Sequence, residues 1–219
     1  MSTADGAAAA PLLLLDVDGV VNVVTRAGDP TVWSDWQTGT AYNELGGWPI
    51  LWSPTVIDHL RRWHTAGLCE IRWLTTWLHE APRDLSRLLE LPPYAVMAGR
   101  PLSDTAPSPK GALSHGEATG RAARDALTGK WWKADLVFEQ LRAEPTRPVL
   151  WIDDELRFDK NLRAHLMATA DCLLIGPQRF HGLTPQDLLK AEQWLRSRAS
   201  RPAADEPTEA PPKPTGEST

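Results

Sequence analysis

Near its start the chain contains the stretch Leu12-Leu13-Leu14-Leu15-Asp16-Val17-Asp18-Gly19-Val20. A short continuous apolar run is typical of a strand that is buried on both faces, as in a parallel sheet. Two acids and a glycine follow directly where such a strand must end. A plain polar turn would account for this pattern. A calcium loop is excluded, because the ligands that it needs at later alternating positions are missing.

The rest of the sequence alternates between apolar runs and helical patterns. A helix is predicted to begin at Ser53-Pro54, with Ser53 as its cap, and to end at Gly67. Further strands are predicted over 69–75, 94–97, 149–152 and 172–175, and further helices over 83–89, 133–142, 159–169 and 184–197. This repeated βαβ order predicts an α/β fold, a three-layer α/β/α, Rossmann-like arrangement around a mostly parallel sheet.

Composition bounds the class of protein. The 219 residues suit one domain over 11–197. We expect the leader over 1–10 and the proline-rich tail over 198–219 to be disordered. No apolar run approaches the roughly 18 residues of a membrane helix. Two cysteines, Cys69 and Cys172, exclude a disulfide scaffold or a cysteine-rich zinc site, and a cytoplasmic location is expected. The net charge of −5 argues against unaided binding of long nucleic acid.

Polar residues also follow the second and fourth strands. Thr75-Thr76 follows residues 71–74, and a hydroxyl there can hold a phosphate oxygen. Asp153-Asp154-Glu155 follows residues 149–152, and three adjacent acids repel one another unless a cation compensates. Such a site favours a hard ion such as Mg²⁺. The alternative is an acid-rich helix N-terminus, which the helix dipole also favours.

A lysine at the start of the predicted helix over 133–142 would complete the set. Lys133 is the candidate cation for neutralising the acids, and the nearby Lys130 is the alternative. Either lysine could instead be an ordinary solvated surface residue. The strand and acids at 150–155 also suit the opening of a response-regulator receiver, but only 65 residues follow Asp154, and a receiver needs about a hundred.

The order Asp, Asp, Thr, Lys and Asp-Asp at successive strand ends resembles the haloacid dehalogenase-like (HAD) superfamily over most of residues 12–195. The motif Asp16-x-Asp18-Gly19-Val20 carries the resemblance most specifically, followed by Asp153-Asp154. Within the superfamily, residues 16–22 (DVDGVVN) and 73–77 (WLTTW) resemble a compact bacterial group. That group has relatives among HAD domains of RNA-repair proteins.

The resemblance implies a Mg²⁺-dependent phosphatase or phosphotransferase. Asp16 would be the nucleophile that forms an aspartyl phosphate, and Asp18 the general acid and base. Dehalogenating members typically lack an acid at the place of Asp18, so phosphoryl transfer is favoured. The other implied roles are phosphoryl binding by Thr75 and Lys133; metal binding by Asp16, the backbone carbonyl of Asp18, Asp153 and Asp154; and substrate contact by Gly19, Asn22, Thr76 and Trp77.

Two inserts bear on the substrate. Residues 20–52 are too few for a large cap domain and predict a small β-hairpin flap, whose aromatic side chains either stack on a base or pack onto the sheet. The aromatic residues are Trp33, Trp36, Tyr42, Trp48 and Trp52. Residues 98–129 predict a loop with basic residues.

An open site would admit a phosphorylated small metabolite, a nucleotide or a nucleic-acid end. The alternative function is a phosphate- or nucleic-acid-binding or regulatory module that keeps the fold but turns over little. The sequence leaves the oligomeric state open.

Overall fold

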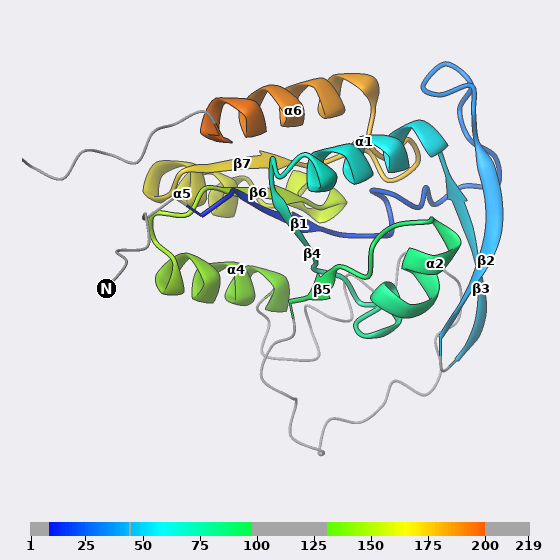
Figure 1. The fold of residues 1–219 in the computed structure, drawn as a ribbon, viewed down its shortest axis with the longest axis horizontal. Coiled ribbons are helices and arrows are strands. Elements are labelled where there is room, and N and C mark those ends of the chain that lie inside the picture. Colours follow the sequence, from blue (N-terminus) through cyan, green and yellow to red (C-terminus); the bar gives the residue numbers. More distant parts are fainter. Residues whose placement is uncertain (1–8, 44, 98–130, 200–219) are drawn as a thin grey trace, which may run out of the picture.

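A five-stranded parallel sheet forms the centre of the computed structural model (Figure 1), which describes residues 9–43, 45–97 and 131–199. The strand order is β5-β4-β1-β6-β7. The strands are β1 (Leu12–Leu15), β4 (Glu70–Trp73), β5 (Ala95–Val96), β6 (Val149–Ile152) and β7 (Cys172–Ile175). The predicted mostly parallel sheet is confirmed, with strand ends that differ from the prediction by one or two residues at β4 and β5.

The four leucines of β1 lie in the middle of this sheet. Leu15 pairs with Trp73 of β4 on one side and with Ile152 of β6 on the other. Leu13 and Leu15 point into one apolar core, and Leu12 and Leu14 into a second core on the opposite face. Because successive side chains of a strand point to opposite faces, a continuous apolar run is what two buried faces require.

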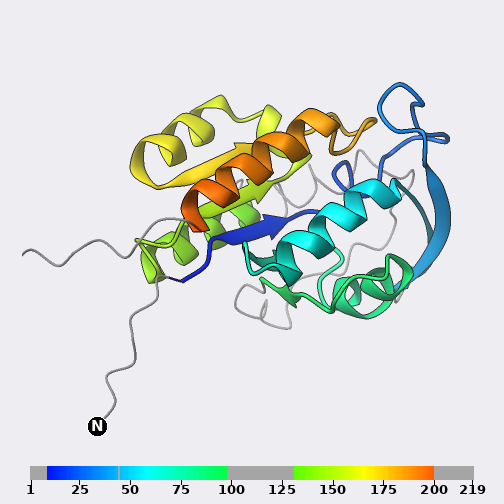
Figure 2. The same ribbon diagram turned by 45° about the horizontal axis from the view of Figure 1, so that its top comes forward.

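Helices cover both faces, which confirms the predicted three layers. On one face, α1 (Pro54–Thr65) and α6 (Pro185–Ala199) lie beside each other across the sheet (Figure 2). They contribute buried residues that include Leu60, Trp63 and Leu195. On the other face lie α4 (Trp132–Ala143) and α5 (Lys160–Thr169), which contribute Val137 and Leu166.

The insert after β1 forms the predicted β-hairpin. Its strands β2 (Gln37–Asn43) and β3 (Gly46–Trp52) pair antiparallel in a sheet of their own. Its tryptophans mostly pack: Trp52 is buried, and Trp33 and Trp48 lie against the core. The indole of Trp33 donates to the carbonyl of Leu183, and that of Trp36 to the carbonyl of Asp29. Tyr42 remains 57% exposed.

The structure also differs from the prediction in places. The helix predicted over 83–89 is a π-helical turn, η1 (Ala81–Leu85), followed by α2 (Ser86–Leu88); it begins earlier because proline near its start needs no hydrogen-bond partner for a backbone N–H. Helix α6 continues to Ala199, so Arg198 belongs to it and pairs with Asp171 rather than opening the tail. The insert over 98–129, Lys130 and most of the predicted leader and tail lie outside the described residues. Within the described ranges, no helix combines the length and apolar character needed to cross a membrane.

Ser53 does not cap α1 with its side chain, contrary to the prediction from the sequence. Ser53 stands at the cap position but makes no side-chain cap bond. Its hydroxyl instead donates to Asp35, whose other carboxylate oxygen accepts from the backbone N–H of Thr55 at 2.9 Å and from its hydroxyl at 2.6 Å. An aspartate from the loop before the hairpin therefore caps this helix, and the same bonds fasten that loop to the domain.

We predict that Asp35→Ala lowers the free energy of unfolding by about 1–2 kcal/mol, the usual cost of removing a helix cap. Urea unfolding followed by circular dichroism measures this. Asp58→Ala is the matched control, because Asp58 lies in the same helix, is 60% exposed and pairs with Arg61. An exposed pair of this kind contributes under about 0.5 kcal/mol. Equal losses in the two variants would contradict the capping role.

Candidate active site

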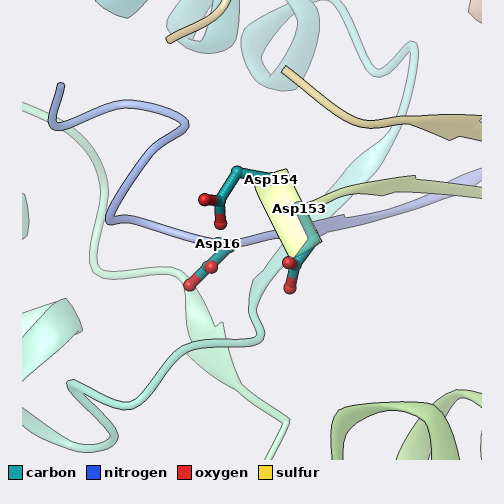
Figure 3. A group of neighbouring side chains, drawn as sticks. All are labelled: Asp16, Asp153 and Asp154. Atoms are coloured by element: carbon teal, nitrogen blue, oxygen red, sulfur yellow. The ribbon is translucent and has the colours of Figure 1, made fainter. Parts of the chain in front are cut away.

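Three aspartates gather at the carboxyl ends of β1 and β6 (Figure 3). The register Leu15–Ile152 sets Asp16 beside Asp153, and Asp154 follows in the next residue. Each offers one carboxylate oxygen, and these oxygens all lie within 4.8 Å of one another. All three side chains are buried, Asp153 completely. Strand pairing thus brings together acids that lie far apart in the sequence.

Lys133 enters the cluster from the first turn of α4. Its Nζ lies 2.7 Å from Oδ2 of Asp16 and 2.8 Å from Oδ2 of Asp153. The lysine side chain is only 5% exposed, so the surface alternative does not describe it. Asp153 also accepts from the backbone N–H of Glu155 and caps a 3₁₀ turn, η2 (Asp154–Arg157). The sequence offered a cation site or an acid-rich helix start as alternative explanations for residues 153–155, and the structure shows both an acidic cluster and a capped turn there.

The electrostatics of the cluster follow from burial. Burial, together with the charge of Asp16, raises the pKa of Asp154 to about 6. Burial also raises the pKa of Asp153, but Lys133 opposes that rise. The same contact raises the pKa of the Lys133 ammonium, against the effect of its own burial, because Asp153 and Asp16 favour the charged form. Because Nζ of Lys133 lies 2.8 Å from Oδ2 of Asp153, we take this contact to be an ion pair.

This arrangement fits a divalent cation. The three carboxylates outnumber the nearby cations, Lys133 and the guanidinium of Arg179 beside Asp154, so the buried site keeps an excess of negative charge. Mg²⁺ is a hard ion that prefers carboxylate oxygens and tolerates bound water at its remaining positions. Asp16, Asp153 and Asp154 are the residues that could hold it. The carboxylate of Asp18 is not part of the group, and metal binding by its carbonyl stays a prediction.

Gly19 makes room for this cluster. After β1 the chain turns tightly, with the carbonyl of Val17 accepting from the N–H groups of Val20, Val21 and Asn22. Gly19 has φ +78°, and a Cβ there would lie 2.6 Å from Cγ of Asp154. Any side chain would therefore strain the turn and displace an acid. Gly19 shapes the site, and its predicted contact with substrate stays a prediction.

Asp18 occupies a different environment from Asp16. One of its carboxylate oxygens accepts from the Asn22 amide at 2.7 Å, and the other from the Trp77 indole at 3.0 Å. Burial raises the pKa of Asp18 above its ordinary value; the Asn22 bond lowers it less. Asn22 and Trp77 were expected to contact substrate, which stays a prediction. The structure shows that both hold Asp18.

The two threonines after β4 differ in exposure. Thr75 is 1% exposed, and its hydroxyl accepts weakly from the N–H of Trp77, at 3.4 Å. Thr76 is exposed. Both follow β4, which pairs directly with β1, so both lie at the same edge of the sheet as Asp16. Phosphate contact by either threonine stays a prediction.

The loop after β7 adds a residue that sequence reasoning missed. Nε of Arg179 lies 3.9 Å from Oδ2 of Asp154. Backbone bonds from Val24 to Arg179, and from Leu183 to Val20, join this loop to the turn after β1. The neighbouring Phe180 is 57% exposed. Arg179 stands four residues after β7 ends at Ile175, and the three residues between them carry no acid or hydroxyl that would mark this loop as part of the site.

Comparisons with known proteins support the resemblance to the HAD superfamily. No curated protein and no solved structure matches the chain. A model of one family, described as the HAD domain in Swiss Army Knife RNA repair proteins, matches residues 12–188. The match begins at the first leucine of β1 and extends into α6, and so includes every strand of the central sheet and the whole acidic cluster. The chain therefore belongs to the family of HAD domains found in Swiss Army Knife RNA repair proteins.

Proposed function

We propose that this protein is a Mg²⁺-dependent phosphatase or phosphotransferase that forms an aspartyl phosphate on Asp16. Membership of the HAD family supports an enzyme of phosphatase type in general. The observation that carries the finer proposal is the buried contact of Lys133 with both Asp16 and Asp153, beside the third acid Asp154. A site for binding phosphate alone gains nothing from three buried acids, because they repel the ligand.

The residues supply the steps of the reaction as follows. An oxygen of Asp16 bonds to phosphorus while the bond from phosphorus to the leaving oxygen breaks. Asp18 gives its proton to that leaving oxygen. Asp18 then takes a proton from water as the water attacks phosphorus, which releases inorganic phosphate and restores Asp16. Lys133 and Thr75 hold the phosphoryl oxygens as charge develops.

A bound Mg²⁺ would lower the repulsion between the anionic nucleophile and the anionic phosphate. Asp16, Asp153 and Asp154 are its proposed ligands. The proposed substrate is a phosphomonoester.

We predict metal-dependent hydrolysis of p-nitrophenyl phosphate that Asp16→Asn reduces by about three orders of magnitude or more, since the nucleophile is lost. Release of nitrophenol with Mg²⁺, and after its removal by a chelator, is the measurement. Asp84→Asn is the control, because Asp84 pairs with the exposed Arg87 and is not one of the clustered acids. Absence of turnover by folded wild-type protein, checked by circular dichroism, would reject the proposal and favour the binding module.

Lys133→Met tests the contact at the centre of the cluster. Without Mg²⁺ we expect the free energy of unfolding to fall by about 3–5 kcal/mol, because two buried carboxylates lose their cation. Added Mg²⁺ should restore part of that stability, since a metal ion can take over the compensation, but it should not restore turnover. Thermal and urea unfolding with and without Mg²⁺ measure the first effect.

Lys160→Met is the matched control, because Lys160 is exposed at the start of α5. We expect a change within about 0.5 kcal/mol in that variant. If Lys133→Met were equally harmless, the buried contact would not describe the protein in solution.

The proposed substrate class is a phosphorylated nucleic-acid end. The family's description places related domains in RNA repair proteins. Exposed aromatic side chains support the same class: Phe158 ends the turn that begins at Asp154 and is 74% exposed, and Phe180 stands next to Arg179. Aromatic rings beside a phosphate site can stack the bases of a single strand.

We expect Phe158→Leu and Phe180→Leu to raise KM for a 5′- or 3′-phosphorylated oligonucleotide by roughly 5- to 10-fold, the lower part of the range for loss of one stacked base. The KM for a small alkyl phosphate should stay unchanged. Met167→Ala is the control. Met167 is also exposed, at 59%, but it lies near the end of α5, just before the amino end of β7, whereas the acidic cluster lies at the carboxyl ends of the strands. A KM for the oligonucleotide that no variant alters would favour a small-metabolite substrate.

A further inference from the structure

Both oxygens of the Asp18 carboxylate are bound by donors from other parts of the chain. Nδ2 of Asn22 donates to one oxygen at 2.7 Å, from the turn after β1. Nε1 of Trp77 donates to the other at 3.0 Å, from the segment after β4. Both donors follow Asp18 in the sequence, 4 and 59 residues away. Together they fix the plane of the carboxylate.

Neither donor can take a proton from Asp18. An indole N–H only donates. The amide of Asn22 could in principle turn its oxygen toward Asp18, but that oxygen already accepts from the backbone N–H of Leu51 at 2.9 Å. The bond to Leu51 therefore determines which end of the amide faces Asp18. When Asp18 is protonated, its proton has no acceptor in Asn22 or Trp77 and remains available to the substrate.

The same bond joins Asp18 to the hairpin. Leu51 belongs to β3, and its carbonyl also accepts from the N–H of Val23 at 2.9 Å. Asn22 thus bridges a catalytic acid and the base of the hairpin with one side chain. Trp77 packs in the same apolar core as Ile50 and Trp52 of that strand. A displacement of β3 would consequently be transmitted to Asp18 through Asn22.

We propose that Asn22 and Trp77 are positioning residues that hold Asp18 for proton transfer to the leaving oxygen, and that Asn22 couples this position to the hairpin. The inference rests on the proposed function. A general acid must lie within hydrogen-bond reach of the atom that it protonates, and a small displacement is costly. The effect of losing either donor should therefore depend on how much the leaving group needs a proton.

Trp77→Phe tests this, because it removes the indole N–H and keeps an aromatic ring in the core. We would measure kcat/KM, which covers the steps up to departure of the leaving group, for p-nitrophenyl phosphate and for an alkyl phosphate. The alkyl oxygen needs protonation and the nitrophenolate does not. We expect a loss of roughly 10-fold or more with the alkyl phosphate and about 2-fold or less with the nitrophenyl ester.

Trp33→Phe is the matched control. The Trp33 indole makes a bond of similar length, 2.8 Å, but to the carbonyl of Leu183. We expect kcat/KM for both esters to stay within about 2-fold of the wild type. Asn22→Asp is the second variant, because it keeps an acceptor for Leu51 and replaces the donor to Asp18 by a repelling oxygen. It should show the same dependence on the leaving group as Trp77→Phe.

The outcomes separate this inference from the function on which it rests. Equal losses on both esters in Trp77→Phe and Asn22→Asp would show a merely structural role and overturn the inference, while turnover by the wild type would leave the proposed function intact. Absence of turnover by the folded wild type with either ester would overturn both. Circular dichroism and thermal unfolding of each variant establish that the losses are measured on folded protein.

Discussion

The contact of Lys133 with Asp16 and Asp153 joins α4 to the two central strands β1 and β6. Removing an ammonium and two carboxylates from water is costly, and the attraction between them offsets that cost only with good geometry. The geometry comes from three elements at once: β1 and β6, whose register sets the acids side by side, and α4, whose first turn brings the lysine. The sheet and the helix layer must both be in place before this cluster is compensated.

The apolar cores impose that arrangement. Alternate leucines of β1 serve opposite faces, so the strand is covered by α1 and α6 on one side and by α4 and α5 on the other. A strand covered on both faces has no polar surface of its own, and its first polar residue is Asp16. Burial of the cluster follows, as does the raised pKa of Asp154. The fold creates a buried negative excess that a divalent cation is suited to compensate.

The sequence could predict what depends on local pattern. The four leucines gave the central strand, and the acids and threonines directly after strands indicated one edge of the sheet. It could not predict contacts between side chains from distant segments. Asp35 capping α1, Trp77 bound to Asp18 and Arg179 beside Asp154 each join residues 20 or more positions apart, and no periodicity reports such pairs. The bond from Trp77 to Asp18 escapes sequence reasoning for this reason, whereas the bond from Asn22, only four residues from Asp18, depends on the shape of the turn after β1.

Asp16 and Asp18 show how one short motif can place two carboxylates in different electrostatic surroundings. Asp16, the proposed nucleophile, contacts the positive charge of Lys133, which favours the anionic form that would attack phosphorus. Asp18, the proposed acid, accepts from the neutral donors Asn22 and Trp77, which lower its pKa less than burial raises it, and a raised pKa favours the protonated form. Enzymes commonly separate acid from nucleophile by giving two carboxylates unlike surroundings. The two carboxylates have unlike partners here, because Asp16 contacts Lys133 whereas Asp18 is bound by Asn22, whose amide also accepts from Leu51 of the hairpin.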